Sequence, residues 1–89
     1  LTLAYPNPFN SSTTIPVHAY GSGAYTLQVF NTRGQVVFAE TNWINDGGVY
    51  NFMWSGMDDA GNDLTSGSFF FQISTGSELV SSGKLLLLK

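Results

Sequence analysis

Regularly spaced turn signals constrain this chain more than any other feature. Clusters of Gly, Asn, Asp and Ser recur about every 8–12 residues, a spacing typical of an all-β sandwich or barrel. They stand at residues 21–23, 31–34, 45–48, 58–62, 66–67 and 76–77. Between them, no run of ten or more residues repeats with the helical period. The chain is therefore expected to fold as an all-β domain.

Four of the intervening runs alternate apolar and polar residues with the period of two that a strand requires. Their apolar faces are Ile15, Val17 and Ala19; Tyr25, Leu27 and Val29; Tyr50, Phe52 and Trp54; and Phe69, Phe71 and Ile73. Phe70 is the exception, because it falls on the outer face of its run. Pro16 lacks an N–H, which predicts an edge strand or a bulge at this position.

Three further segments complete the expected architecture. Residues 35–41 and 84–89 are apolar on both faces, so their orientation stays open. With a short extended piece at residues 3–5, the count becomes seven strands. Two antiparallel sheets packed face to face are the natural way to bury one side of each strand. At 89 residues, the whole chain makes one domain, 1–89.

Charge and cysteine content exclude several classes of function. Only 9 residues are charged, and Arg33, Lys84 and Lys89 are the only basic ones in a chain of net charge −3. Nucleic acid is therefore not an expected partner. No apolar run approaches the ~20 residues of a membrane-spanning helix. With no cysteine, the chain has no disulfide, thiol nucleophile or thiolate zinc site, and we predict no metal or other cofactor.

Few residues suggest chemistry, and we predict no catalytic residue. His18 is the only histidine, and we interpret it as a solvent-facing strand residue. The loop Asp58–Asp63 offers oxygen ligands for calcium, but Asp and Asn also stabilise turns, and we favour the turn. Trp43, Tyr20 and Phe70 lie off the expected core face, so a sugar-binding aromatic platform stays an alternative.

The opening segment is far more specific than a turn signal. It reads Tyr5-Pro6-Asn7-Pro8-Phe9-Asn10 and leads into Thr13-Thr14-Ile15. Its two prolines fix φ at alternate positions, and its asparagines can bond the local backbone. The segment resembles the opening motif of the type A C-terminal sorting domain of the type IX secretion system.

Four more motifs follow in the order that this family shows. They are Val29-Phe30-Asn31 with Gly34-Gln35, Trp54-Ser55-Gly56 with Asp59 and Gly61, Ser66-Gly67-Ser68-Phe69-Phe70-Phe71, and the closing Gly83-Lys84-Leu85-Leu86-Leu87-Leu88-Lys89. Departures from the family pattern are Ser11 for proline, Ser55 for aspartate, Phe69 for tyrosine and Gly83 for a first lysine. The resemblance implies an immunoglobulin-like antiparallel sandwich of about seven strands.

The resemblance also implies a role in delivery rather than catalysis. Family domains end secreted proteins whose N-terminal cargo domain reaches the periplasm by a separate signal, so this chain reads as a fragment of a larger protein. An outer-membrane translocon and a sortase-like protease then carry the cargo to the cell surface or the extracellular space. The residues expected to be recognised are Lys84, Leu85, Leu86, Leu87, Leu88 and Lys89.

Recognition of these residues could use the exposed edge of the last strand, which can pair with another chain by strand addition. A buried closing strand is an equal interpretation of the same run, and the two are compatible. The alternative for the whole domain is an immunoglobulin-like spacer or attachment module, structural or carbohydrate-binding, similar to domains found in flagellar hook-cap proteins and polysaccharide-degrading enzymes.

Overall fold

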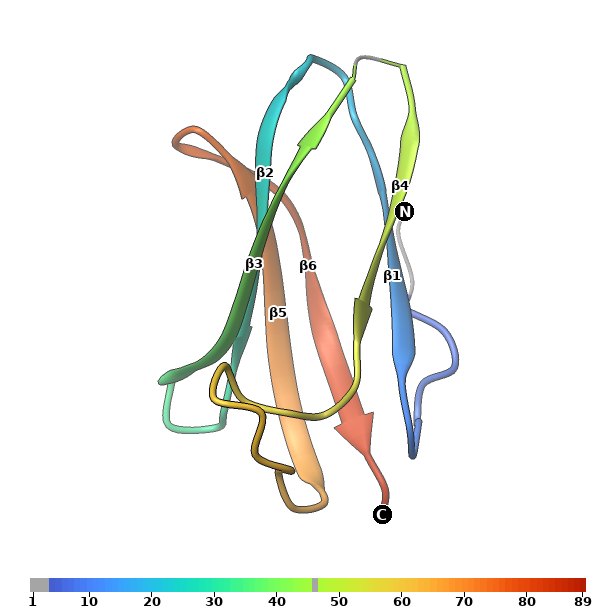
Figure 1. The fold of residues 1–89 in the computed structure, drawn as a ribbon, viewed down its shortest axis with the longest axis vertical. Coiled ribbons are helices and arrows are strands. Elements are labelled where there is room, and N and C mark those ends of the chain that lie inside the picture. Colours follow the sequence, from blue (N-terminus) through green and yellow to red (C-terminus); the bar gives the residue numbers. More distant parts are fainter. Residues whose placement is uncertain (1–3, 46) are drawn as a thin grey trace.

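The all-β prediction is confirmed. A computed structural model describes residues 4–45 and 47–89, which form six antiparallel strands (Figure 1). The strands are β1 (Thr13–His18), β2 (Gly23–Phe30), β3 (Val36–Ile44), β4 (Val49–Trp54), β5 (Gly67–Thr75) and β6 (Glu78–Leu87). Within the described residues, no helix has the length and apolar character needed to cross a membrane.

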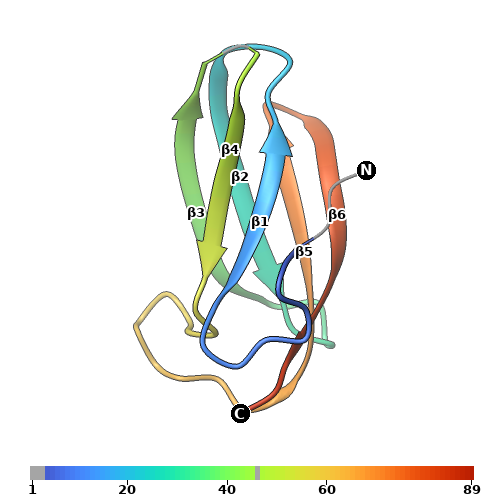
Figure 2. The same cartoon turned by 90° about the vertical axis from the view of Figure 1, so that its right-hand side faces the viewer.

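The strands form two sheets of unequal size that pack as an immunoglobulin-like sandwich. One sheet pairs β1 with β4, and the other has the order β3-β2-β5-β6. The two layers face each other in Figure 2. Pro16 lies on β1, which pairs only with β4, so its predicted place on an edge strand is confirmed.

The core consists of the alternating apolar faces expected from the sequence. Ile15, Val17, Leu27, Val29, Phe52 and Ile73 have no exposed surface, and Ala19, Tyr25, Trp54, Phe69 and Phe71 are buried as well. Tyr50 is only half-buried, and Phe70 faces outward with 43% of its surface exposed. The period-two pattern therefore assigned inside and outside correctly on these four strands.

Within the described residues, the expected seventh strand is reduced to a single bridge. Leu3 lies outside the described residues, and Tyr5 makes a single antiparallel bridge to Thr14. Pro6 follows Tyr5 directly, and Pro8 comes two residues later. Neither proline has an N–H that could extend a ladder of backbone hydrogen bonds. Residues 5–9 therefore approach the sheets through isolated bridges instead of as a strand.

The two ambiguous runs belong to longer strands at the edges of the larger sheet. Residues 35–41 contribute to β3, which continues to Ile44, and residues 84–89 largely form the end of β6, which begins at Glu78. On β3, Val36 is exposed while Val37 and Phe38 are half-buried. From Phe38 to Ile44 the burial alternates along β3, and at the end of β6 Leu85 and Leu87 are buried.

Gly83 on β6 provides a test of core packing. A Cβ atom at Gly83 would lie 2.7 Å from Cε2 of Phe71, a ring that is itself buried in the core. We expect Gly83→Ala to lower the stability by about 1–3 kcal/mol, because the ring has to move. Thermal unfolding measures the change. The matched variant is Gly67→Ala on β5, where a Cβ meets nothing within 4 Å; equal melting temperatures for the two would contradict the packing.

Candidate functional site

The predicted recognition residues end strand β6 and are half inside the protein. Leu85 and Leu87 point into the core with no exposed surface. Leu86 is half-buried, and Lys84 and Leu88 are exposed. The run is therefore a buried closing strand on one face, as one interpretation expected, and its other face carries accessible side chains.

The opening motif lies directly against this strand. Nδ2 of Asn7 donates to the carbonyl of Lys84 at 2.8 Å, and Oδ1 of Asn7 accepts from the amide of Leu86 at 2.9 Å. The amide of Phe9 donates to the carbonyl of Leu86 at 3.0 Å, and the amide of Leu88 donates to the carbonyl of Phe9 at 2.8 Å. We call residues 5–10 with residues 84–89 the terminal clamp.

The terminal clamp corrects one expectation about the last strand. The backbone from the carbonyl of Lys84 to the amide of Leu88 was expected to offer an exposed edge for strand addition. Asn7 and Phe9 occupy that edge instead, through backbone bonds and an asparagine side chain that imitates a paired strand. A partner strand could pair there only after residues 5–10 had moved away.

Aromatic packing anchors the terminal clamp to the core. The ring of Phe9 is buried and lies 5.7 Å from Trp54, measured between centroids, and Trp54 meets Phe69 edge-on at 5.1 Å. Nε1 of Trp54 donates to the carbonyl of Met57 at 2.9 Å, which satisfies the polar end of the buried indole. Three residues predicted from separate motifs thus form one stack.

Gly56, a glycine of the family motifs, makes room for the end of β6. Gly56 has a φ of 72°, and a Cβ on it would lie 3.2 Å from Cδ2 of Leu87. Gly67 stands opposite Leu87 in the β5–β6 ladder. A side chain at Gly56 would be strained and crowded, so this position suits glycine in particular.

The remaining motif residues divide between two places. In the terminal clamp, the carbonyl of Pro6 accepts from Oγ1 of Thr13 at 2.8 Å, while Pro8 and Asn10 are exposed. Gly34 and Gln35 lie apart from it, in the β2–β3 turn. There Oδ1 of Asn31 accepts from the amide of Gln35 at 3.1 Å, and Gly34 has a φ of 80°.

The last residue is held by partners that the sequence did not reveal. The amide of Lys89 donates to Oγ of Ser66 at 2.7 Å, and Nζ of Lys89 pairs with Asp63 at 3.1 Å. The carboxylate side chain is 70% exposed, so this ion pair contributes little to stability. Neither Ser66 nor Asp63 carried a signal for this role, because the contact joins residues 23 or more positions apart.

The acidic loop 58–63 is an ordered turn. Oδ1 of Asp58 accepts from the amides of Ala60 and Asn62 at 3.0 and 2.8 Å. Hydrogen bonding, first from the Asn62 amide, lowers the pKa of the Asp58 carboxyl below its ordinary value of 3.8. Across the described part of the chain, no three acidic, histidine or cysteine residues gather into a possible metal site. The hydrogen bonds support the turn interpretation.

The exposed aromatic residues do not gather into one platform. Tyr20, Trp43 and Phe70 are exposed by 87%, 67% and 43%. Trp43 pairs with Ala24 at one end of β2, whereas Phe70 pairs with Phe30 at the other end. Six residues of strand separate these positions by about 20 Å. A flat sugar-stacking surface built from these rings is therefore not present.

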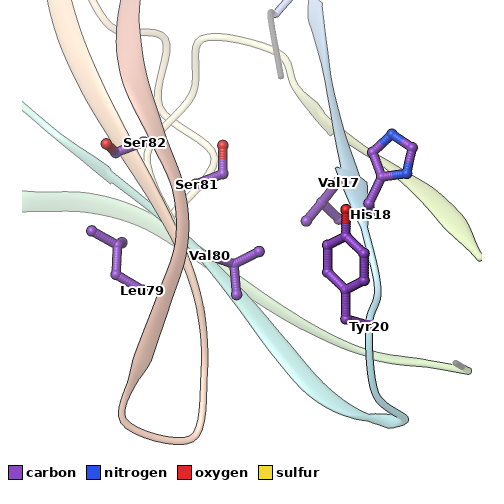
Figure 3. Close-up of a pocket in the computed structure, with 7 residues that line it drawn as sticks. All are labelled: Val17, His18, Tyr20, Leu79, Val80, Ser81 and Ser82. Atoms are coloured by element: carbon purple, nitrogen blue, oxygen red, sulfur yellow. The ribbon is translucent and has the colours of Figure 1, made fainter. Parts of the chain in front are cut away.

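A groove of about 400 Å³ runs between β1 and β6 at the end of the sandwich away from the terminal clamp. Figure 3 shows Val17 and Val80 pointing toward each other across it, with His18 and Tyr20 on the β1 side. His18 is exposed, as predicted, and its ring stacks on Tyr20 with a centroid distance of 6.5 Å. The groove is where the two sheets separate, since none of the strands in residues 4–45 and 47–89 joins β1 to β6 there.

Comparisons with known proteins agree with this architecture. Residues 10–78 match the sequence profile of the FlgD Ig-like domain. No curated protein sequence matches the chain. Dimeric latent PorU from Porphyromonas gingivalis has a similar structure, with a TM-score of 0.85 and 13% identity over 98% of this chain and 9% of PorU.

Two flagellar structures share the fold as well. FlgD from Xanthomonas campestris and FlgD from P. aeruginosa each have a TM-score of 0.70 and 20% identity. They match 96% and 90% of this chain, which spans 60% and 62% of theirs. At these identities the likeness concerns the fold, and this chain corresponds to only part of each protein.

The terminal clamp predicts a local effect of Asn7→Ala. The substitution removes both side-chain bonds to the edge of β6, which we expect to cost about 1–2 kcal/mol. Hydrogen exchange at the amide of Leu86 should accelerate, while exchange on β2 stays slow. Asn10→Ala is the matched control, because Asn10 is exposed and lies outside the hydrogen bonds that join Asn7 and Phe9 to β6. Unchanged exchange at Leu86 in Asn7→Ala would contradict the clamp.

The lowered pKa of Asp58 predicts a pH dependence. The ionised carboxylate of Asp58 stabilises the folded state, and this stabilisation is complete above pH 3.8, the ordinary pKa of the group. It is lost as the pH falls through the lower pKa that Asp58 has in the folded state. Asp58→Asn should therefore be less stable than the wild type at neutral pH, and the two should converge below about pH 3.8. Urea unfolding at several pH values tests this; a difference that is constant with pH would argue against it.

Proposed function

Because the chain belongs to the FlgD Ig-like domain family, we propose that it is a non-catalytic module whose fold serves attachment or transport, and specifically a C-terminal sorting domain of the type IX secretion system. In this role the domain directs an attached N-terminal cargo domain across the outer membrane to the cell surface or the medium. An outer-membrane translocon and a sortase-like protease would be its partners.

The observation that carries this proposal is the terminal clamp. Residues 5–10 and 84–89 are two of the five segments that resemble the sorting domains, and they bond to each other at four points of backbone or side chain. Trp54, Gly56 and Phe69 from two further motifs pack around the same strand end. Four of the five motifs thus form one structural unit, and the Gly34 motif lies apart from it.

The structural likeness to PorU is additional support. PorU is a type IX system protein, and nearly the whole of this chain superposes on a small part of it. The TM-score with PorU exceeds that with either FlgD structure, although the sequence identity is lower. Fold geometry therefore groups the chain with PorU more closely than with the flagellar domains.

The clamp also changes how recognition would work. Because the edge of β6 is paired within the domain, a translocon that binds the folded form reads side chains rather than backbone. The accessible ones are Lys84, Leu88 and Lys89, with part of Leu86. Recognition by strand addition would first require residues 5–10 to leave the edge.

A second candidate is a structural spacer, favoured by the family membership and the two FlgD structures. FlgD from Xanthomonas campestris is associated with the hook capping that flagellar assembly requires. A structural role within a larger assembly is therefore the natural alternative for a domain of this fold. The parent gene discriminates the two: sequence beyond Lys89 favours a spacer, and a stop codon after it favours sorting.

Deleting residues 84–89 from the full-length parent tests the sorting function. We expect the cargo to accumulate in the periplasm instead of on the cell surface, because the recognised residues are gone. Fractionation with surface protease digestion measures the distribution. If the truncated parent reaches the surface at normal levels, the sorting function is wrong.

The deletion also removes two buried leucines, so a folding control is needed. Leu27→Ala opens a cavity in the core on β2 and costs about 2–5 kcal/mol while keeping residues 84–89 intact. Below its melting temperature this variant should still export its cargo. Its export separates loss of recognition from loss of stability.

A further inference from the structure

The outer face of the four-stranded sheet changes character along its length. Most residues that face outward in its middle and far rows are small or polar: Thr41, Thr26 and Ser74, and then Ala39, Gln28, Gln72 and Ser82. The exceptions, Trp43 and Leu79, are exposed but stand apart, on the two opposite edge strands. The row next to the β2–β3 turn is different, and across the four strands it reads Val36, Phe30, Phe70 and Lys84. Val36 and Phe70 are exposed by 47% and 43%. Apolar side chains that gather in one row of a mostly polar face mark an interaction surface.

This row borders a hollow of about 670 Å³, which we call the outer-face hollow. Its lining includes the aromatic residues Phe30, Phe70 and Phe71, Asn31 and Gly34 of the β2–β3 turn, and Lys84 of β6. These residues come from three of the motifs noted in the sequence. The Gly34 motif, which takes no part in the terminal clamp, thus meets the start of the recognition run here.

The charge of the hollow contrasts with that of the protein. Of the three basic residues in a chain of net charge −3, Lys89 is paired with Asp63. The other two are Lys84 in the hollow and Arg33 in the adjoining turn. Neither forms an ion pair with any residue in 4–45 or 47–89, and no acidic residue lines the hollow. Lys84 therefore lines the hollow together with Phe70, and Arg33 lies in the turn that adjoins it.

We propose that the outer-face hollow binds a protein segment that places an apolar side chain against Phe30 and Phe70 and a carboxylate beside Lys84. This inference rests on the proposed sorting function and specifies the chemistry of its partner. Apolar contact supplies the anchor of such an interface, and the complementary charge supplies orientation and selectivity.

Two other occupants fit the hollow less well. A second copy bound through the same surface would bring two Lys84 and two Arg33 residues together, because a two-fold interface is self-complementary. An anionic membrane would gain only about 1 kcal/mol from each of two cations, and it would be repelled by the net negative charge. A protein segment with a single carboxylate brings no second set of cations to the surface, and it carries far less negative charge than an anionic membrane.

The test uses the full-length parent in cells with an active type IX system. We expect Phe70→Ser and Lys84→Glu each to lower the amount of cargo on the surface about tenfold. Leu79→Ser is the control for exposed apolar area, since Leu79 is 56% exposed at the far end of β6. Lys84→Gln and Asn51→Asp each lower the net charge by one. Only Lys84→Gln should reduce export, because Asn51 lies outside the hollow. Melting temperatures show that each variant is folded.

Suppressors of Lys84→Glu identify the partner. If a carboxylate lies beside Lys84, restored export should arise from acid-to-base substitutions clustered in one protein of the export machinery. If Phe70→Ser and Lys84→Glu export normally while deletion of residues 84–89 abolishes export, the proposed binding at the outer-face hollow is wrong and the sorting function is unaffected. If export survives the deletion, both the binding proposal and the sorting function are wrong.

Two binding measurements decide between the occupants. Sedimentation with vesicles of equal parts phosphatidylglycerol and phosphatidylcholine tests for a membrane, and analytical ultracentrifugation of the parent tests for a dimer. Binding or dimerisation that Phe70→Ser and Lys84→Glu abolish would overturn a protein partner in favour of that occupant. A parent protein that is monomeric and does not sediment with the vesicles agrees with the proposal.

Discussion

Strand β6 closes the four-stranded sheet, and its outer edge carries N–H and C=O groups that no neighbouring strand pairs with. Unpaired backbone groups along an edge invite association with other chains. Over residues 84–88 the protein meets this constraint with its own opening segment, through the side chain of Asn7 and the backbone of Phe9. Pinning Phe9 there also places its ring on Trp54, which in turn meets Phe69. The end of the sandwich that holds the terminal clamp is therefore organised around the outer edge of β6.

The unequal sheets explain why the two ends of the molecule differ. A two-stranded sheet faces a four-stranded one, so β1 and β6 each have an edge along the same side of the sandwich (Figure 2). Near the terminal clamp, Tyr5 bridges to β1 and Phe9 bridges to β6, which closes this side. At the other end nothing described joins them, and the groove with Val17 and Val80 stays open. The segment 5–9 thus connects the two sheets at the end where the proposed recognition residues lie.

Recognition and folding are inseparable in such an arrangement. Leu85 and Leu87 belong to the core, while Lys84 and Leu88 on the same strand face solvent. A partner that reads the exposed side chains is therefore also testing whether the domain is folded, because the alternation depends on the buried leucines. Low charge fits this role, since a surface of Ser, Thr, Asn and Gln leaves the few free cations as distinctive features.

The sequence by itself determined which residues face inward on four strands, because alternation with a period of two is a local property that burial amplifies. It also located the turns and the motif segments, since Gly, Pro and Asn impose their backbone preferences locally. It missed that Pro6 and Pro8 reduce an expected strand to single bridges, and it left the orientation of the two edge runs open. Only the tertiary structure decided that Asn7 hydrogen-bonds to the edge of β6 at Leu86, that Asp63 forms an ion pair with Lys89, and that Gly34 and Lys84 line one hollow. Those contacts join residues up to 79 positions apart, and their pairing follows from strand order and register, which no local pattern encodes.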